Sequence, residues 1–328
     1  MTRLVSVIVP CYNEEKTIVL LLQALVNQSY PLTHIEVVIA DGLSTDQTRY
    51  RIDDFQTRFS DLKVRIIDNP RKNIPAGLNA ALKAATGEII VRLDAHSAPR
   101  EDYIARCVHA LEEGLGDNVG GVWEITPPRQ NWQARGIAAA AAHPFGVGDA
   151  HYRHTEKAMW VDTVPFGSFF LRLIDKIGYF DEQLLANEDY EFNVRIRQAG
   201  GKIWLDPAIR STYFSRGNFL DLARQYWRYG YWKAKMLRKY PNTIRWRQAL
   251  PPFFVLSMLG LALLSIWLPF ARWIIMLELL AYILVLIAAG IQVAMKKKDI
   301  EYMISVPLAI ATMHLSWGSA FLWSILTG

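Results

Sequence analysis

Acidic side chains follow three apolar runs in the first part of this 328-residue chain. Glu14 lies in the segment Pro10-Cys11-Tyr12-Asn13-Glu14-Glu15, Asp41 begins the segment after the second run, and Asp94-Ala95-His96 ends a later one. A carboxylate at the end of a strand can bind a uracil N–H, a ribose hydroxyl or a cation. Each cluster alone could be a turn or a helix cap, but the three together indicate a ligand site.

The apolar runs that carry these clusters are predicted to be strands. They are rich in β-branched residues, alternate with helical patterns, and cover residues 5–9, 35–40, 64–67 and 88–93. The intervening helical patterns cover residues 14–27, 45–59 and 76–86. Nearly continuous apolar strands suit burial on both faces, and the alternation predicts an α/β fold with a mostly parallel, Rossmann-like sheet. Ligands of such sheets bind at the carboxyl ends of the strands.

Two helix starts are predicted from polar residues. Glu14 and Glu15 are expected in the first turn of the first helix, where carboxylates favour the positive end of the helix dipole. Ser44, Thr45 and Asp46 are N-cap candidates for the second helix.

Charge and cysteine content indicate a protein beside an anionic surface. The net charge is +5, and charged residues become rare after Arg247. This excess does not indicate nucleic acid, because headgroups and diphosphates attract the same charge, and no nucleic-acid partner is expected. Cys11 and Cys107 have no metal or redox spacing and are expected to be reduced core thiols. Residues 4–9 are too short for a signal peptide and are followed by Pro10, so a cytosolic N-terminal domain is expected.

The C-terminal part has the composition of a membrane anchor. Residues 218–239 mix cations with tyrosine and tryptophan, which predicts an amphipathic helix at a lipid interface, with a solvated helix as the alternative. Three apolar stretches follow at 253–270, 273–294 and 304–326, each near the ~20 residues that cross a bilayer. A soluble helical bundle is disfavoured because three such stretches in succession contain so few charges.

The remaining cations predict the orientation in the membrane. Arg245 and Arg247 precede the first stretch, Lys296-Lys297-Lys298 separates the second from the third, and only Arg272 is expected in the first turn between stretches. The positive-inside rule then places the N-terminal domain and the lysine cluster in the cytosol.

Two ionisable residues interrupt the apolar stretches. Glu278 is expected to snorkel to the nearby helix end, and His314 to hydrogen-bond a neighbouring backbone.

Taken together, these motifs resemble those of the family 2 glycosyltransferases over about residues 4–240. The resemblance implies a GT-A fold, followed here by an interfacial helix and about three transmembrane helices. Asp41 matches the base-binding aspartate of that family. The residues implied in nucleotide-sugar binding are Pro10, Tyr12, Glu14, Asp41, Asn79, Asp94, Gln225 and Arg228.

The same resemblance implies the catalytic groups. Asn187-Glu188-Asp189 is similar to the Glu-Asp motif that holds the catalytic base, so Asp189 is the expected base and Glu188 is expected to orient or assist it. A base that deprotonates an acceptor hydroxyl during direct displacement inverts the anomeric centre. The alternative for Asp189 is a helix-capping carboxylate ahead of residues 190–199, and the two roles can coexist.

A divalent metal is expected on the diphosphate. Asp94-Ala95-His96 occupies the place of the family's Asp-x-Asp metal motif, with His96 in place of the second aspartate. Carboxylate ligands suit Mg²⁺ or Mn²⁺, and the imidazole favours Mn²⁺ somewhat.

Two further groups are expected near the diphosphate. Gln225-Tyr226-Trp227-Arg228-Tyr229 resembles the Gln-x-x-Arg-Trp motif with tyrosine in place of tryptophan, so Gln225 and Arg228 are expected to contact diphosphate or acceptor. A salt-bridged interfacial helix is the alternative. The cations nearest to Asn79 are Arg71 and Lys72, and whether either contacts diphosphate stays open.

The narrower resemblance is to succinoglycan-type glucosyltransferases. It implies transfer of one sugar, with glucose expected, from a UDP-sugar to a polyprenyl-diphosphate-linked acceptor at a bacterial inner membrane. The expected parts are a cytosolic domain (1–217), an interfacial region (218–250) and an anchor (251–328). The alternatives are a non-catalytic sugar-nucleotide-binding scaffold of an export complex and a processive polysaccharide synthase, although three helices are few for a pore.

Overall fold

The computed structural model describes residues 2–328, which form two compact units. Residues 2–124 and 155–213 form the first, here called the sheet unit. Ile125–His154 and Phe214–Gly328 form the second, called the helical unit. A segment from the middle of the chain therefore belongs with the C-terminal helices, a grouping that the sequence pattern does not indicate.

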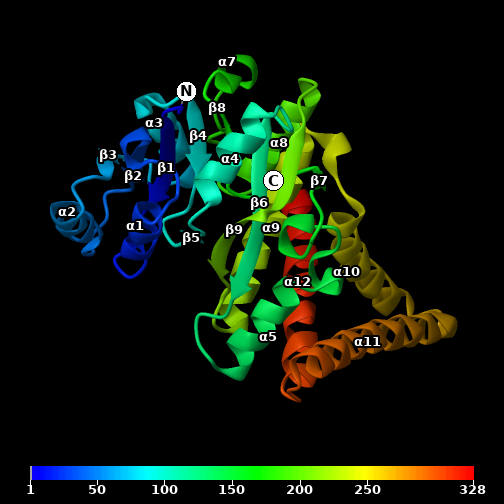
Figure 1. The fold of residues 1–328 in the computed structure, drawn as a ribbon. Helices are drawn as coiled ribbons and strands as arrows, with labels where there is room; N and C mark the ends of the chain where they lie inside the picture. The colour runs from blue at the N-terminus through cyan, green and yellow to red at the C-terminus, as the bar shows by residue number, and fades with distance from the viewer. Residues whose placement is uncertain (1) are drawn as a thin grey trace. The chain divides into compact units, whose positions relative to one another are not determined.

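The first four strands are parallel neighbours, as predicted from the sequence (Figure 1). They are β1 (Val5–Cys11), β2 (Ile35–Asp41), β3 (Lys63–Asp68) and β4 (Ile89–Arg92), in the order β3-β2-β1-β4. In this register, Cys11 lies beside Asp41, and Asp41 beside Asp68. The carboxyl ends of β1, β2 and β3 thus deliver their loops to one edge of the sheet.

The second half of the sheet is antiparallel, so the sheet is mixed rather than mostly parallel. It continues β4-β8-β6-β9-β5, with β7 also paired to β9. The β4–β8, β6–β8, β5–β9 and β7–β9 pairs are antiparallel. Antiparallel neighbours need no helical crossover, and the strand–helix alternation ends after β4. These strands are β5 (Ala98–Pro99), β6 (Asn118–Thr126), β7 (Met159–Trp160), β8 (Ser168–Phe170) and β9 (Ile203–Phe214).

Both faces of the parallel half are covered by helices. Alternate residues of β1 and β2, among them Val7, Val9 and Ile39, join one buried cluster with residues of α1, α2 and α4. Pro10 and Ala40 belong to the other set of alternating residues, whose side chains point to the opposite face of the sheet. Gly77 of α3 lies against both of them, so α3 covers that face. The helices of the sheet unit are α1 (Ile18–Val26), α2 (Thr48–Arg58), α3 (Ile74–Ala84), α4 (Tyr103–Glu112), α7 (Leu173–Ile177), α8 (Glu188–Gln198) and the 3₁₀ turn η1 (Leu32–His34).

The first helix starts later than predicted. α1 begins at Ile18, so Glu14 and Glu15 precede it instead of occupying its first turn. The carbonyl of Glu14 accepts hydrogen bonds from the N–H groups of Thr17 and Ile18. The carboxylate of Glu15 accepts from Gln47 N at 3.0 Å. Both glutamates are therefore engaged in the turn that joins the loops after β1 and β2.

The second helix also lacks the predicted cap. α2 begins at Thr48 after Gln47, which makes no side-chain capping bond. Ser44 bonds Asp41 instead, and Asp46 accepts from Thr48 N at 3.0 Å. The residues expected at the N-cap thus organise the loop ahead of the helix.

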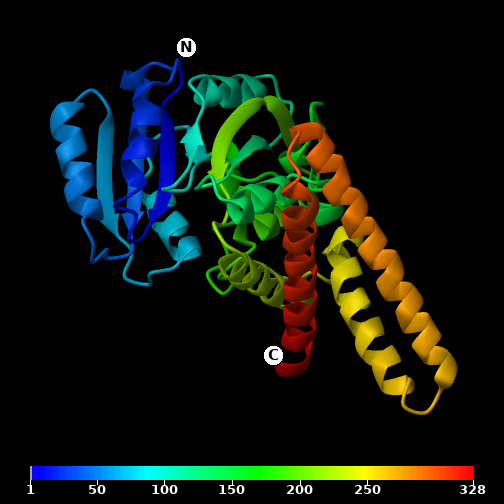
Figure 2. The same ribbon diagram turned by 90° about the horizontal axis from the view of Figure 1, so that it is seen from below.

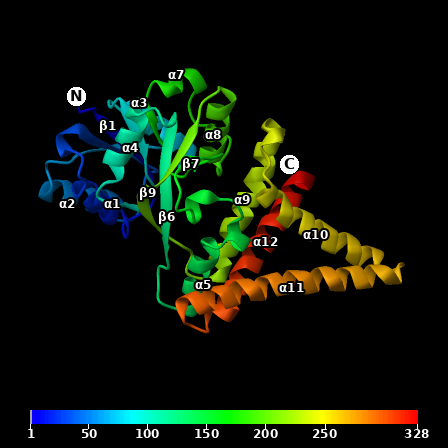
Figure 3. The same cartoon turned by 45° about the vertical axis from the view of Figure 1, so that its right-hand side comes forward.

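The helical unit is built around α12, which packs against α5, α9, α10 and α11 (Figure 3). Its amphipathic helix α9 is capped by Asn218, which accepts from Asp221 N, and matches the predicted helix. The helices of this unit are α5 (Trp132–Ala141), α6 (Pro144–Val147), α9 (Phe219–Lys239), α10 (Trp246–Leu264), α11 (Pro269–Lys297) and α12 (Tyr302–Thr327), with 3₁₀ turns η2 (His151–Arg153) and η3 (Pro241–Thr243).

Three of these helices, α10, α11 and α12, are long and apolar enough to cross a membrane. In Figure 2, α10 (yellow) leads into the turn that joins it to α11 (orange), and Figures 1 and 3 show the two helices diverging from that turn. The first apolar helix ends at Leu264, earlier than predicted, and Arg272 lies in α11 instead of the connecting turn. Its Nε donates to Ser265 O at 3.0 Å, so the guanidinium satisfies a carbonyl at the end of α10.

The two polar residues of these helices have partners inside the helical unit. Glu278 accepts a hydrogen bond from the Ser257 hydroxyl of α10, which replaces the snorkelling expected from the sequence. His314 has the Tyr282 hydroxyl of α11 3.1 Å from its Nδ1, and the backbone contact expected for it stays a prediction. Such bonds between helices are a common way to satisfy polar groups in an apolar surrounding.

Glycine allows α12 to approach α10 closely. A Cβ added at Gly318 would lie 2.5 Å from the carbonyl oxygen of Pro251, whereas one at Gly260 of α10 would meet nothing within 4 Å. We therefore expect Gly318→Leu to cost about 1–3 kcal/mol of stability by overpacking. The measurement is thermal unfolding in detergent, with Gly260→Leu as the matched control. Equal melting temperatures for the two variants would contradict this packing.

Candidate active site

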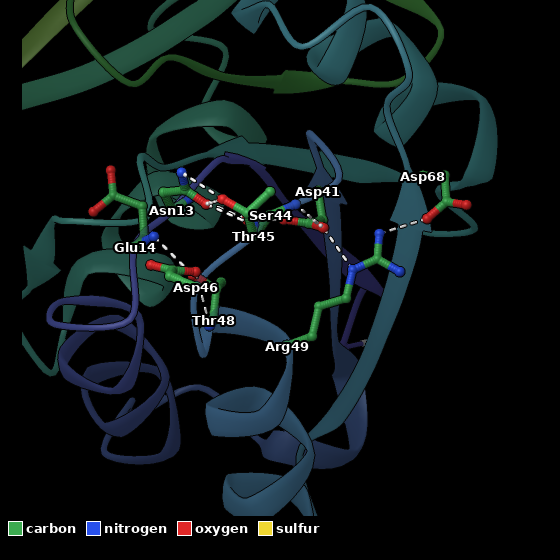
Figure 4. Close-up of polar contacts among 9 residues, drawn as sticks. All are labelled: Asn13, Glu14, Asp41, Ser44, Thr45, Asp46, Thr48, Arg49 and Asp68. Atoms are coloured by element: carbon green, nitrogen blue, oxygen red, sulfur yellow. Dashed lines mark hydrogen bonds and ion pairs between the residues drawn. The ribbon is translucent and has the colours of Figure 1, made fainter.

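The loops after β1 and β2 are locked together by side-chain hydrogen bonds (Figure 4). Asn13, in the left-handed region at φ 54°, donates its N–H to Ser44 Oγ at 2.8 Å and accepts from Thr45 N at 2.8 Å. The N–H of Glu14 donates to Thr48 Oγ1 at 2.7 Å. These bonds make a single preorganised surface at the carboxyl edge of the parallel strands.

Asp41 is fully buried beneath this surface (Figure 4). Its carboxylate accepts from Ser44 N at 3.0 Å, from Ser44 Oγ at 2.5 Å and from Arg49 Nε at 2.6 Å. Arg49 also pairs with Asp68 at 2.5 Å, which ties the ends of β2 and β3 together. The sequence patterns pointed to Asp41 but not to Arg49, because nothing in the spacing marks an arginine on α2 as its partner.

The loop after β1 also presents an exposed aromatic ring. Tyr12 is 45% exposed, and the Lys72 ammonium lies 5.8 Å from its ring centroid. Pro10 is at the end of β1, close to Gly77 of α3. An exposed ring beside a cation suits stacking with a planar base.

Asn79 lies buried on α3, with its amide directed at the segment before α8. Its Nδ2 donates to Phe180 O and to Glu182 Oε1, both at 2.9 Å, and its Oδ1 accepts from Phe180 N at 2.9 Å. Arg71 forms an ion pair with the same Glu182. These contacts give Asn79 a role in holding the segment, while its predicted contact with a nucleotide sugar stays a prediction.

A buried arginine brings together the acidic groups from distant parts of the sequence. The Arg92 side chain is 5% exposed, and its Nη2 lies 2.9 Å from Glu188 Oε1 and 3.3 Å from Asp94 Oδ1. Its Nη1 lies 3.5 Å from Asp189 Oδ2. The sequence predicted Asp94, Glu188 and Asp189 as site residues, but it did not predict the arginine that gathers them.

Burial and mutual repulsion control the protonation of the acidic pair. Burial, reinforced by the charge of Asp189, raises the pKa of Glu188 to about 7 despite the opposing attraction of Arg92. Burial also raises the pKa of Asp189 above its ordinary value, again against Arg92. For Arg92, burial disfavours the charge, but the three carboxylates outweigh it and raise the pKa. A carboxyl pKa that is raised above its ordinary value makes the carboxylate a stronger base, which suits a group that accepts a proton.

The two acidic residues differ in access. The Glu188 side chain is 7% exposed and that of Asp189 is 35% exposed. α8 begins at Glu188 after Asn187, which makes no side-chain cap, so Asp189 lies in the first helical turn and not at the N-cap. Its Oδ1 accepts from Tyr190 N at 2.8 Å. Asp189 is therefore the member of the pair that an external hydroxyl can reach.

Arg92 and Asp189 also line a small cavity with Asn118 and Asn193. The cavity has a volume of about 10 Å³, enough for roughly one water molecule. A sugar does not fit there, so a substrate must approach Asp189 from its exposed side.

His96 faces Glu14 across the loops. Its Nδ1 lies 3.0 Å from Glu14 Oε1, and the two side chains are 39% and 24% exposed. Burial tends to raise the pKa of Glu14, but the hydrogen bond and charge of His96 outweigh it and lower that pKa. Glu14, predicted to bind the nucleotide sugar, thus contacts the predicted metal ligand.

The acidic groups around Arg92 do not form a complete metal site by themselves. Three carboxylates around one guanidinium leave a charge of −2 when all are ionised. Within residues 2–328 there is no group of three histidine, cysteine or acidic side chains with metal-binding geometry. Asp94 and His96 can therefore supply two ligands at most. This suits Mg²⁺ or Mn²⁺ bound mainly through substrate phosphates and water.

Gln225 and Arg228 lie on α9 in the helical unit. The Gln225 amide donates to the Tyr229 hydroxyl at 3.0 Å. Their predicted contacts with diphosphate or acceptor stay predictions.

Both cysteines are buried thiols, as predicted. Burial raises the pKa of Cys107 to about 12 and also raises that of Cys11. Neither is a reactive thiolate at neutral pH.

The chain is similar to several known proteins. The model of "Glycosyl transferase family 2" matches residues 6–178. The chain is 27% identical to a dolichyl N-acetyl-α-D-glucosaminyl phosphate 3-β-D-2,3-diacetamido-2,3-dideoxy-β-D-glucuronosyltransferase of Methanococcus voltae, covering 99% of this chain and 98% of the relative. It is 28% identical to the succinoglycan biosynthesis protein ExoA of Rhizobium meliloti, covering 96% and 93%.

A solved structure shares the fold. It is the mannosyltransferase PcManGT from Pyrobaculum calidifontis in complex with GDP-Man and Mn²⁺, with a TM-score of 0.66 and 21% identity. The likeness covers 98% of this chain and 88% of that one.

Proposed function

Since the chain belongs to glycosyl transferase family 2 and is a hexosyltransferase with the GT-A fold, we propose that it transfers one sugar, with inversion, from a UDP-sugar to a lipid-linked saccharide. The observation that carries this proposal is the acidic group around Arg92, in which Asp189 is the accessible member. It lies in the same unit as the preorganised loops after β1 and β2.

Asp189 is the proposed general base. Its carboxylate takes the proton from the acceptor hydroxyl as that oxygen attacks the anomeric carbon. The new C–O bond forms as the bond to the diphosphate breaks, and the nucleoside diphosphate leaves with the electron pair. Attack from the face opposite the leaving group inverts the configuration. The 35% exposure of Asp189 supports this role over Glu188.

The remaining site residues are proposed to bind the donor. Asp41 is the proposed base-binding aspartate, and its buried carboxylate bonds Arg49 and holds Ser44 in the loop that would receive the base. Tyr12 would stack its exposed ring on the same base. Asp94 and His96 would hold Mn²⁺ or Mg²⁺, which when bound supplies positive charge to the leaving diphosphate. The partial exposure of both side chains supports this choice.

The acceptor proposal rests on the relatives. One relative's name gives a dolichyl phosphate sugar as its acceptor, and another belongs to succinoglycan biosynthesis. For this chain we propose a polyprenyl-diphosphate-linked saccharide as acceptor and glucose as the transferred sugar, in the synthesis of a cell-surface polysaccharide. The apolar helices α10, α11 and α12 support an acceptor held at a membrane.

The test is a panel of UDP- and GDP-sugars incubated with membranes that contain the protein and with lipid-linked acceptors. Addition of one sugar from a single UDP-sugar, absent with Asp189→Asn, is the expected result. Donor binding without hydrolysis or transfer would indicate the scaffold alternative, and products of many added sugars would indicate a processive synthase. Either outcome would contradict the proposal.

We further propose that the protein lies in a bacterial inner membrane with its catalytic unit in the cytosol. Residues 251–328 would be the anchor, and α9 would lie at the headgroups within an interfacial region of residues 218–250. The lysine cluster Lys296-Lys297-Lys298 at the end of α11 supports a cytosolic location of that end.

Cysteine labelling tests this orientation. Lys297→Cys should react with an impermeant reagent only from the cytosolic side, and Leu268→Cys, in the turn between α10 and α11, only from outside. The native Cys11 and Cys107 are buried and supply little background. The opposite pattern of labelling would refute the orientation.

A further inference from the structure

The contacts of Arg92 divide its three carboxylates into two kinds. Glu188, which is almost fully buried, and Asp94 lie within hydrogen-bond distance of Nη2, at 2.9 Å and 3.3 Å. Asp189 is exposed on one side and lies 3.5 Å from the guanidinium, an ion pair without a hydrogen bond. We propose that Arg92 is a positioning residue that orients the base Asp189, and that Glu188 anchors Arg92 instead of acting as a second base. This inference rests on the proposed function.

The distance to Asp189 suits a base. The backbone N–H of Tyr190 fixes Oδ1, and the Arg92 charge faces Oδ2. Because no hydrogen bond joins Arg92 and Oδ2, the guanidinium orients the carboxylate without occupying the lone pairs that must receive the acceptor proton. A shorter, bidentate contact would stabilise the carboxylate so strongly that it became a weak base.

Arg92 is itself held from a second side. The Phe166 ring centroid lies 6.0 Å from its Cζ, in the range of a cation–π contact. Phe166 has a φ of 48°, a left-handed conformation that is strained for a residue other than glycine. Strain of this kind persists where the surrounding structure demands it. The ring of Phe166 and the carboxylate of Glu188 therefore restrict Arg92 to one place.

Arginine is required here for its shape as well as its charge. Its two Nη atoms reach Asp94, which follows β4, and the two carboxylates of α8, which is distant in sequence. A lysine ammonium is a point charge and cannot span the same set. We expect Arg92→Gln to lower kcat by about 10²-fold, as expected for a base displaced by about 1 Å, and to change the donor KM much less, since Asp94 is its only partner assigned to the donor site. Arg92→Lys should recover part of the loss.

The decisive variant is Arg92→Gln/Glu188→Gln, which removes one charge of each sign. If Arg92 orients Asp189, the double variant stays as impaired in kcat as Arg92→Gln while its melting temperature recovers. If Arg92 serves only to neutralise buried Glu188, the double variant recovers kcat, and the inference is wrong. Arg58→Gln, at an exposed ion pair on α2, is the control and should match the wild type.

Three measurements distinguish a failure of the proposed base Asp189 from a failure of the proposed role of Arg92. They are UDP binding by calorimetry, thermal unfolding, and the turnover of Asp189→Asn. An active Asp189→Asn protein would refute the proposed base and this inference with it. A second outcome would refute this inference alone: Asp189→Asn is inactive, but Arg92→Gln binds UDP normally and keeps a kcat within about threefold of the wild type. A displacement of the base by about 1 Å should lower kcat far more than that.

Discussion

Replacement of Asp189 by asparagine is expected to lower kcat for sugar transfer by about 10²–10⁴-fold, the usual contribution of a general base. Asparagine keeps the size of the side chain and an oxygen for the Tyr190 N–H, but it cannot take a proton. Donor affinity should stay close to that of the wild type, because the donor contacts are assigned to other residues. Initial rates and UDP calorimetry measure the two quantities separately.

The matched control is Asp175→Asn, which removes an exposed carboxylate from α7. It should leave both kcat and donor affinity unchanged. Turnover of Asp189→Asn near the wild-type value would exclude Asp189 as the base. A parallel loss of UDP binding would instead indicate that Asp189 supports the donor site.

Removal of divalent metal is the second change with a large expected effect. Chelation should abolish transfer, and Mn²⁺ should restore it at least as well as Mg²⁺, since an imidazole is a softer ligand than a carboxylate. His96→Ala should raise the metal concentration for half-maximal activity by at least about tenfold, in the range found for metal sites that lose supporting groups. His96→Asp should retain activity and shift the preference toward Mg²⁺.

The contact of His96 with Glu14 requires an independent measurement. Electron paramagnetic resonance of Mn²⁺ in the presence of UDP reports metal affinity without turnover. Unchanged Mn²⁺ affinity in His96→Ala, together with a raised acceptor KM, would show that His96 belongs to the acceptor site and not to the metal.

The parallel half of the sheet was predictable because its information is local. Its strands β1, β2 and β4 are nearly continuous apolar runs, helical patterns separate the strands, and the polar residues at the strand ends mark the edge where ligands bind. The antiparallel half was not predictable in the same way. β5, β7 and β8 have two or three residues each, too few to show a period.

The sequence predicted the acidic residues of the site but not Arg92, the residue that pairs with them. Arg92 looks like any charged residue at a strand end, and its closest partner, Glu188, is far away in the sequence. The same limit explains the two helix starts. Locally, Glu15 suits a first helical turn and Ser44 suits an N-cap, but here they bond groups in neighbouring loops. Local preference cannot reveal that a partner from another loop takes the place of the cap.

The segment Ile125–His154 limits how the protein can be divided experimentally. Ile137 and Ala140 of α5 pack in the same apolar cluster as α12, and Arg135 forms ion pairs with Asp299 and Glu301 between α11 and α12. A soluble protein made by truncation after Tyr213 would expose that apolar surface and those unpaired charges. The chain passes between its two units three times. Removal of the C-terminal helices would therefore require that the segment Ile125–His154 is also excised and that a short linker joins Glu124 to Thr155.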